Sequence, residues 1–341
     1  MANFTPDYDD DEFDNVKSKS QIKREMEALQ QLGKKLLDLK PAQLKKVPIG
    51  EDLAHAIKIV NDTGYGLTSG IESLDEREVS YWKENLKAGN LYVNRGTTGA
   101  IVLRQPFGGM GKSAIGAGRK AGFYNYITQF VDITEKKNPV PKRTHMNDLT
   151  LFLKHCKVAS MQKEDFEKLE IALQSYIENY ENEFSKEKDY ARVRGEDNHF
   201  RYLPLNSVVI RVCKDDCIFD IVARIMAARV SKVNFTVSVD DNDFLKVFLK
   251  NSPELFTSKD KLVTEDEKKF IQTIKNFDRV IYSDISKVSK DVFKESAKTL
   301  VFIVRQNAMM EGRLELLNYF SEQSISHSFH RYGNIGSRAS E

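Results

Sequence analysis

The chain of 341 residues contains little cysteine and no long hydrophobic run. Its three cysteines, Cys156, Cys213 and Cys217, are an odd number in a large chain. This argues against a disulfide framework and favours a reducing compartment. No stretch approaches the roughly 18 consecutive apolar residues of a membrane-spanning helix, and the first residues lead into acidic ones rather than a signal-peptide core. The sequence therefore predicts a cytoplasmic protein with no membrane span.

The sequence also lacks the spacings of a metal or redox centre. Cys213 and Cys217 are separated by three residues, with no His or Cys pair at zinc spacing beside them. We expect both to be packing residues, because a thiol behaves as a small hydrophobic group. His327 and His330 stand three apart on an expected strand and would face opposite sides. No metal site is predicted.

Net charge is small, +2, but it averages over unlike segments. Residues 1–16 form an acidic arm, and residues 17–46 carry nine Lys or Arg against three Asp or Glu. Apolar residues recur there at three- and four-residue spacing, which predicts a basic amphipathic helix within residues 1–50. The segments 18–25, 29–33 and 46–48 resemble the N-terminus of a ribosome-associated family that assists large-subunit maturation. We expect no nucleic-acid or ribosome partner from this short stretch.

Glycine is concentrated in residues 90–122, which hold eight of the 18 glycines. A short apolar strand at 91–94 leads into this stretch. The density of glycine indicates tight turns and close approach of the backbone to another group. An ordinary connecting loop rich in turns is the alternative.

The residues on either side of this glycine-rich stretch show both helical and strand-like spacing of apolar side chains. Apolar spacing predicts helices at 51–61 and 75–86, the second closed by Gly89, and a strand at 67–73. The later half of residues 123–134 alternates and predicts a further strand. We place a domain at 51–137 and a linker rich in proline and lysine at 138–150.

Residues 151–320 show helices and strands in turn. A charged helix at 163–187, which we expect to expose its ionic face, precedes apolar strands such as 208–212 and 233–239. Continuous apolar strands alternating with helices predict a doubly wound parallel sheet. No glycine-rich phosphate loop follows any strand, so no dinucleotide site is predicted there. The tail, residues 321–341, alternates and predicts an extended strand that pairs with another sheet.

Three motifs carry a resemblance to a known family. The segments 61–70, 88–96 and 106–109 resemble the C-terminal third of aldehyde dehydrogenases. Residues 94–102 resemble the glutamate-semialdehyde dehydrogenase half of bifunctional proline utilisation A flavoproteins, and 324–326 with 330–334 resemble their terminal motif. The implied fold is α/β: an incomplete aldehyde dehydrogenase portion, then a Rossmann-like noncatalytic domain, behind a helical N-terminal segment.

The resemblance implies a role for the glycine stretch. It assigns Thr98, Gly99 and Ala100 to the loop that anchors the substrate's amino-acid end. Small residues let backbone N–H groups reach a carboxylate closely. Phe107 is implied as an aromatic wall for the aliphatic part of the substrate, with a plain core aromatic as the alternative.

The reacting groups that the family needs are not found at matching positions. No cysteine precedes Cys156, and residues 45–50 stand where the family has a segment that grips the nicotinamide ribose. We therefore expect no catalytic and no cofactor-binding residue in this chain. The family uses NAD, and FAD belongs to the proline dehydrogenase half.

The implied family function is oxidation of glutamate semialdehyde to glutamate, and we expect the chain not to catalyse it alone and to bind the semialdehyde weakly. One alternative is a binding module that completes an aldehyde dehydrogenase fragment, or pairs with its own copy through the tail. A second is a ribosome-associated protein acting through residues 1–50. We expect residues 51–137 to be the least stable part, since they normally pack against a larger domain.

Overall fold

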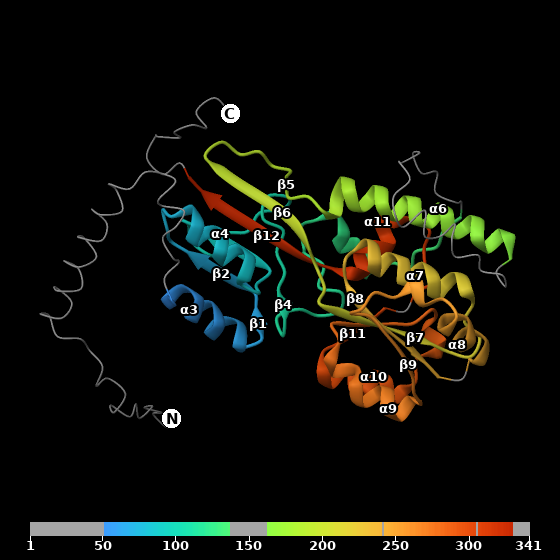
Figure 1. The fold of residues 1–341 in the computed structure, drawn as a ribbon. Coiled ribbons are helices and arrows are strands. Elements are labelled where there is room, and N and C mark those ends of the chain that lie inside the picture. Colours follow the sequence, from blue (N-terminus) through green and yellow to red (C-terminus); the bar gives the residue numbers. More distant parts are fainter. Residues whose placement is uncertain (1–50, 137–161, 241, 305, 330–341) are drawn as a thin grey trace, which may run out of the picture. The chain divides into compact units, whose positions relative to one another are not determined.

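The computed structural model describes residues 51–136, 162–240, 242–304 and 306–329 (Figure 1). The chain divides into two units, Met1–Ala54 and His55–Glu341, and the account below concerns the second. The predictions for residues 1–50, the linker 138–150, Cys156 and His330 lie outside the described residues.

The first described elements follow the predicted order of helix, strand, helix, strand. Asp75 caps α4, because its carboxylate accepts the backbone N–H of Arg77 at 2.9 Å. The elements are α3 (Glu51–Asp62), β1 (Tyr65–Gly66), β2 (Thr68–Ile71), α4 (Glu76–Asn85) and β3 (Asn90–Val93).

The prediction that Gly89 closes this helix is wrong, since Leu86 is the C-cap of α4. Gly89 instead lies where a Cβ atom would stand 1.9 Å from the carbonyl oxygen of Gly108. Glycine is required there for close packing of two backbones rather than for a helix end.

The strand predicted in the later half of residues 123–134 is also wrong. A 3-10 helix, η2 (Tyr124–Gln129), follows Phe123. The Thr128 hydroxyl donates to the Asn125 carbonyl at 2.7 Å, and the Phe123 ring stacks on Phe200 with centroids 3.9 Å apart. The hydrogen bond of Thr128 and the buried stack of Phe123 on Phe200 therefore override the strand that the alternating pattern predicts. The short strand β4 (Met110–Gly111), which pairs with β1, precedes this segment.

Downstream, five parallel strands form one sheet in the order β11-β10-β7-β8-β9. Numbered within the sheet, this is the Rossmann-type order 3-2-1-4-5. The strands are β7 (Ser207–Val212), β8 (Asn234–Val239), β9 (Lys261–Thr264), β10 (Arg279–Ile281) and β11 (Phe302–Val304).

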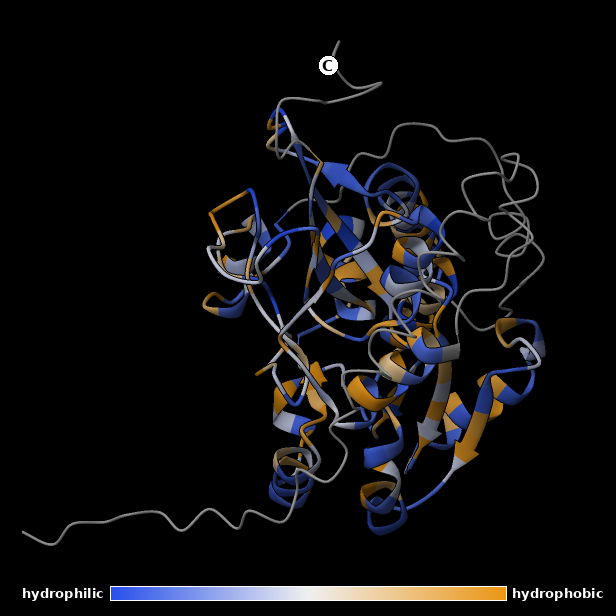
Figure 2. Cartoon of the chain, turned by 90° about the vertical axis from the view of Figure 1, so that its left-hand side faces the viewer, coloured by the Kyte–Doolittle hydropathy of each residue, from blue (hydrophilic) through white to orange (hydrophobic). Residues whose placement is uncertain are grey.

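Helices cover both faces of this sheet. Val208, Ile210 and Val212 of β7 face the larger core with α7 and α8, whereas Val209 faces a second core with α9 and α10. The predicted doubly wound fold is confirmed, and the banded colouring of the helices in Figure 2 agrees with helices that bury one face. The helices are α6 (Lys163–Asn179), α7 (Ile218–Val230), α8 (Asp243–Lys250), α9 (Glu267–Thr273), α10 (Lys290–Thr299) and α11 (Gly312–Glu315). Short turns complete these layers: η3 (Tyr180–Phe184), η4 (Pro253–Leu255), η5 (Ile274–Asn276), η6 (Ile285–Lys287) and η7 (Leu316–Tyr319).

A second five-stranded sheet has the order β2-β3-β12-β6-β5. Its central strand, β12 (Phe320–Ser328), pairs in parallel with β3 and in antiparallel with β6 (Glu196–Pro204). The edge strand is β5 (Lys188–Asp189). Of the extended strand predicted for residues 321–341, the part up to Ser328 is present, and both of its partners belong to this chain. Residues 330–341 lie outside the described residues.

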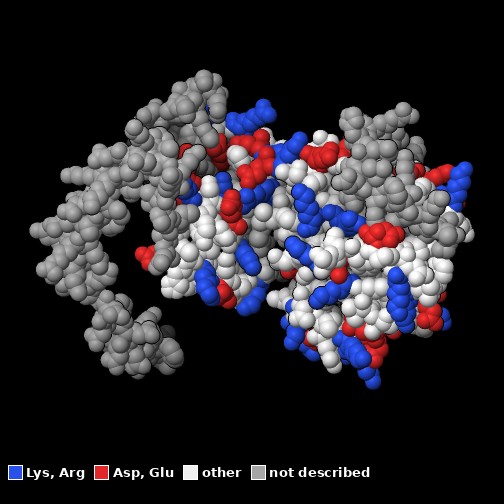
Figure 3. Space-filling view, in the orientation of Figure 1, with Lys and Arg blue, Asp and Glu red and all other residues white. Residues whose placement is uncertain are grey.

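Among the described residues, no helix has the length and apolar content to cross a membrane. Basic and acidic side chains are interspersed on the face shown in Figure 3.

One backbone position offers a test of the fold. Leu300 adopts a left-handed conformation (φ 60°) at the C-cap of α10 and is exposed. Because a Cβ atom is disfavoured there, Leu300→Gly should raise the free energy of unfolding by about 0.5–1 kcal/mol in urea titrations. Leu74→Gly, at an exposed leucine without a positive φ, should instead lower it slightly. Equal effects of the two changes would contradict the assignment.

Candidate functional site

The residues predicted to anchor a substrate lie on an open loop after β3. Thr98, Gly99 and Ala100 are exposed, and Gly99 has a φ of +82°. No heavy atom of the described structure lies within 4 Å of a Cβ built at Gly99. The loop therefore presents its backbone to open space, as capture of a small anion by N–H groups requires.

Phe107 lies beyond this loop and is 37% exposed, which is not the burial of a plain core aromatic. Its N–H donates to the carbonyl of Ala121 at 2.9 Å, and its own carbonyl accepts the Ala121 N–H at 2.9 Å. This bridge fixes the backbone beneath the ring. The ring is left available to contact another group.

Both ends of the anchor loop, residues 95–105, are held by one carboxylate of the downstream domain. Glu196, the first residue of β6, pairs with Arg95 at 2.5 Å and with Arg104. The Gln105 amide donates to the same carboxylate at 2.6 Å. Charge-assisted bonds of this kind are the stronger hydrogen bonds of proteins. Glu196 therefore ties the loop's start to its end.

Burial raises the pKa of the Glu196 carboxyl, but the hydrogen bond from Arg104 and the charge of Arg95 outweigh it and hold the pKa below its usual value. The carboxylate thus stays ionised through neutral and moderately acidic pH. A second clamp comes from β12, where the Ser326 hydroxyl accepts from Arg95 at 2.6 Å.

Three alternate residues of β12 contact the glycine stretch from one face of the strand. Besides Ser326, the Ser324 hydroxyl donates to the carbonyl of Pro106 at 2.6 Å. Glu322 accepts the backbone N–H of Lys120 and the amide of Asn125, each at 2.9 Å. The sequence reasoning missed these residues and Glu196. The available signal was the row of polar residues at every second position of the expected strand.

A buried lysine supports the backbone next to Phe107. Lys120 is fully buried, and its ammonium donates to the carbonyl of Gly108 at 2.5 Å and to Asn90 Oδ1 at 3.2 Å. Burial lowers its pKa to about 7, against the smaller opposing charge of Glu322. The group is closed off from solvent and supports the loop rather than contacting a ligand.

The Rossmann-like sheet does not offer a dinucleotide grip at its switch point between β7 and β10. Asp216, in the turn after β7, accepts the Cys213 N–H at 2.7 Å and also pairs with Ser283 and Lys287. The turn of residues 213–217 holds no glycine, and Asp216 already accepts its Cys213 N–H, so the turn does not present the free backbone N–H groups that receive a pyrophosphate. These residues therefore do not fit NAD.

Neither cysteine in the described residues is activated as a nucleophile. Burial raises the pKa of the Cys213 thiol to about 11. Partial desolvation of the sulfur, and then its hydrogen bond to Asp220, raise the pKa of the Cys217 thiol to about 11 as well, the opposite of a reactive thiolate. Cys213 packs against the smaller core as predicted. Cys217 is exposed, so the packing prediction is wrong for it, because this residue is the N-cap that precedes the buried start of α7 at Ile218.

One group of side chains in the described part has metal-like spacing. Ligand atoms of Asp189, Asp197 and His199 lie within 4.8 Å of one another. The Asp189 carboxylate already accepts three backbone N–H groups, and His199 pairs with Glu187 at 3.2 Å. These bonds close a turn between two strands and account for the cluster.

Two family models match parts of the chain. Residues 47–135 match the model of the aldehyde dehydrogenase family. Residues 15–65 match a second model, that of the dual-action ribosomal maturation protein DarP.

Individual relatives match part of the chain as well. The chain is 43% identical over 91 residues to the bifunctional protein PutA of Rhizobium meliloti, covering 27% of this chain and 7% of the relative. It is 46% identical over 77 residues to a 1-pyrroline-5-carboxylate dehydrogenase of Bacillus cytotoxicus, covering 23% and 15%. A solved structure, proline utilization A from Corynebacterium freiburgense, has a TM-score of 0.62 at 30% identity, covering 83% of this chain and 25% of that one. The resemblance to proline utilisation A is confirmed, and the chain spans a quarter or less of these relatives.

The Glu196 clamp can be tested by proteolysis. Glu196→Gln removes the charge that holds Arg95 and Arg104, a loss of about 1.5–3 kcal/mol. Trypsin cleavage after Arg104 should then become at least about tenfold faster, because cleavage follows the population of the open loop. Mass spectrometry of the fragments measures this. Glu187→Gln, which breaks a comparable pair on the far side of β6, should leave that cleavage rate unchanged.

Lys120 predicts a pH dependence of stability. Its folded pKa, about 7, lies below the unfolded value of 10.5, so the unfolded chain binds more protons between these values. The free energy of unfolding should therefore rise as pH increases from 7 to 9, by up to about 1.4 kcal/mol per pH unit from this group.

Lys120→Met should flatten that rise in urea titrations at several pH values. Lys112→Met, at an exposed lysine, should keep the slope of the unchanged chain. A slope in the Lys120 variant as steep as that of the unchanged chain would contradict the assignment.

Proposed function

We propose that the chain supplies the substrate-anchoring part of a glutamate-semialdehyde dehydrogenase site and does not oxidise the semialdehyde by itself. The observation that carries this proposal is the anchor loop, which is clamped at both ends yet exposed along its middle. Two of the relatives, a 1-pyrroline-5-carboxylate dehydrogenase and a PutA protein, support the substrate class.

In this proposal the N–H groups of Gly99 and Ala100 and the hydroxyl of Thr98 bind the substrate carboxylate. Phe107 contacts the aliphatic carbons that separate the carboxylate end from the aldehyde. The loop needs no rearrangement to bind, since Glu196 and Ser326 already hold it in place. Pre-organisation of this kind lowers the entropic cost of binding.

The proposed lack of activity rests on the reacting groups. Both cysteines in the described residues lie in the Rossmann-like domain with raised pKa values, and the turn after β7 holds no glycine-rich phosphate loop. Thioester chemistry needs a thiolate beside the bound aldehyde, and hydride transfer needs a bound nicotinamide. A complementary aldehyde dehydrogenase chain would supply both.

The proposed partner is therefore an aldehyde dehydrogenase portion that covers the exposed apolar side chains around the loop. Those side chains include Ile101, Val102, Ile115 and Phe107. Exposed large apolar side chains mark interaction sites where they gather into a patch. A cytoplasmic place of action agrees with the low cysteine content, and a ribosomal role of residues 1–50 is the second hypothesis.

The test measures NADH formation at 340 nm with 1-pyrroline-5-carboxylate. The full chain alone should give the blank rate. Mixed with a Bacillus-type 1-pyrroline-5-carboxylate dehydrogenase trimmed of the segment that matches residues 51–136, it should co-elute and restore turnover. Gly99→Val should abolish the restored turnover without preventing co-elution, because the side chain blocks the N–H groups. Turnover by the chain alone, or no co-elution, would contradict the proposal.

A further inference from the structure

On the face of the second sheet that is turned away from Ser326, four side chains of metal-binding type come together. On β6, Asp197 and His199 are two residues apart and therefore point to the same face of the strand. Asp197 stands directly opposite His327 of β12, and His199 stands directly opposite Asp189 of β5. Because directly opposite residues of neighbouring strands share a face, two carboxylates and two imidazoles gather there.

Three of these side chains already lie close to one another. Ligand atoms of Asp189, Asp197 and His199 are within 4.8 Å of one another. The ligand atoms of one tetrahedral zinc ion, each about 2.0–2.2 Å from the metal, stand roughly 3–4 Å apart. Small rotations of the side chains are therefore enough to bring these three groups onto one ion.

The Asp189 carboxylate is held in place by the turn after β5 and keeps a lone pair for a metal. Oδ1 accepts the backbone N–H groups of Ala191 and Arg192 at 2.9 and 2.8 Å. Among the described residues, Oδ2 accepts one N–H, that of Asn198 at 3.0 Å. A carboxylate oxygen has two lone pairs, so Oδ2 can also bind a cation. The same hydrogen bonds fix the direction in which the carboxylate points.

A carboxylate stands behind the imidazole of His199. His199 Nδ1 lies 3.2 Å from Glu187 Oε2. When Nδ1 carries the proton and donates it to Glu187, Nε2 has the lone pair that a metal needs. A carboxylate that receives the second ring N–H is the usual support of a metal-binding histidine, because it fixes the tautomer and the orientation of the ring.

A pocket of about 830 Å³ opens onto this group from the side of α4. Three of the four side chains, all except Asp189, line it. The carboxylates of Glu72, Glu76 and Asp197 in the lining outnumber the ammonium group of Lys83. With the imidazoles neutral, the pocket is therefore negatively charged, which favours a cation over an anion.

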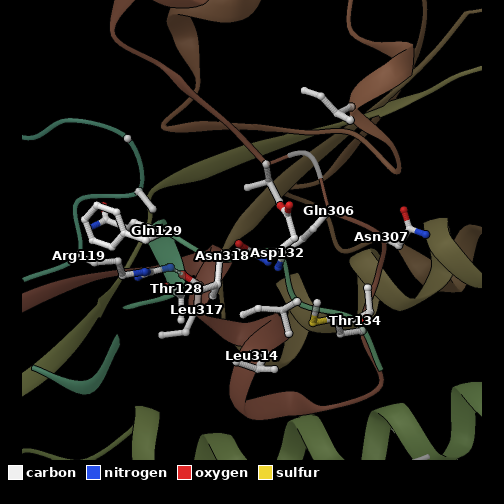
Figure 4. Close-up of a pocket in the computed structure, with 18 of the residues that line it drawn as sticks. Arg119, Thr128, Gln129, Asp132, Thr134, Gln306, Asn307, Leu314, Leu317 and Asn318 are labelled. Carbon is white, nitrogen blue, oxygen red and sulfur yellow. Dashed lines mark hydrogen bonds between the residues drawn. The ribbon is translucent and has the colours of Figure 1, made fainter. Parts of the chain in front are cut away.

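A larger pocket, of about 970 Å³ between residues 116–135 and the carboxyl end of β11, brings no such set together (Figure 4). Its lining in the described structure contains neither histidine nor cysteine. Of its two carboxylates, that of Glu135 accepts the backbone N–H groups of Met310 and Glu311 at 2.9 and 2.6 Å. The other, Asp132, shares the lining with amide side chains such as Gln306.

We propose that Asp189, Asp197, His199 and His327 bind one Zn²⁺ ion. Two imidazoles and two carboxylates suit four-coordinate zinc, whereas Ca²⁺ and Mg²⁺ prefer oxygen ligands alone. His327 Nε2 lies 3.5 Å from Asn94 Nδ2, at the limit of a hydrogen bond, so little is lost when its ring turns toward the metal.

Four protein ligands leave no open position on the ion, which is typical of a structural zinc site. The ion would join β5, β6 and β12, and binding to the folded chain would stabilise it. The site does not depend on the proposed function, because it lies on the other face of β12 from Ser326 and uses none of the residues of the anchor loop.

The test titrates zinc chloride into the full chain after removal of metals with a chelator, with calorimetry and thermal unfolding as readouts. One ion should bind per chain at this site and raise the Tm in a saturable way. Co²⁺ in place of zinc should give the strong visible absorption of a four-coordinate ion without a thiolate charge-transfer band.

His199→Gln and His327→Gln should each weaken zinc binding by about tenfold or more, because each removes one ligand. Both should leave the Tm in excess chelator nearly unchanged, since neither side chain closes a turn. His55→Gln is the matched control at an exposed histidine of α3, and it should keep the zinc affinity within about twofold.

The inference is overturned if the full chain binds no zinc, or if either His199→Gln or His327→Gln leaves the affinity as it is in the unchanged chain. Equal weakening by His55→Gln would overturn it as well. A thiolate charge-transfer band, or the weak absorption of six-coordinate Co²⁺, would also contradict the proposed ligand set.

Discussion

The pairing of β12 on both of its edges is the constraint on which the described structure depends. One edge forms a parallel ladder with β3, and the other forms a nine-residue antiparallel ladder with β6. Strands that are distant in sequence therefore share one sheet. The hydrogen-bonded ladders and the side-chain contacts between them offset the chain entropy that is lost when such contacts form. The face of β12 that carries Glu322, Ser324 and Ser326 then reaches the glycine stretch.

The second sheet and Glu196 hold both ends of the anchor loop, whose middle is exposed. In the Rossmann-like sheet, the Asp216 carboxylate lies in the turn at the switch point and pairs with Ser283 and Lys287.

Local pattern was sufficient to predict the regular elements and the doubly wound sheet, because apolar residues such as Val208 and Val209 alternate between two cores. Where a residue's role depends on a distant partner, the sequence was insufficient. Local pattern places Gly89 at a helix end, but the close approach of the Gly108 backbone is what requires a glycine there. Local pattern likewise predicts a strand after Phe123, but contacts with Phe200 and Glu322 hold that segment in another conformation. Thr98, Gly99, Ala100 and Phe107 were named from the resemblance to a family, and their roles stay predictions. Glu196, 92 residues after Arg104, has no local signature.

The sequence predicts that residues 51–137 are the least stable part, whereas the ladder to β12 couples β3 to the downstream domain. Native-state hydrogen exchange of the full chain, followed by mass spectrometry, tests most directly whether residues 51–137 unfold separately or together with the downstream domain. If β12 joins the two parts into one cooperative unit, the amides of β3 and β12 will open with the same free energy as those of β7. Exchange of β3 at a much lower free energy, while β7 stays protected, would contradict this account.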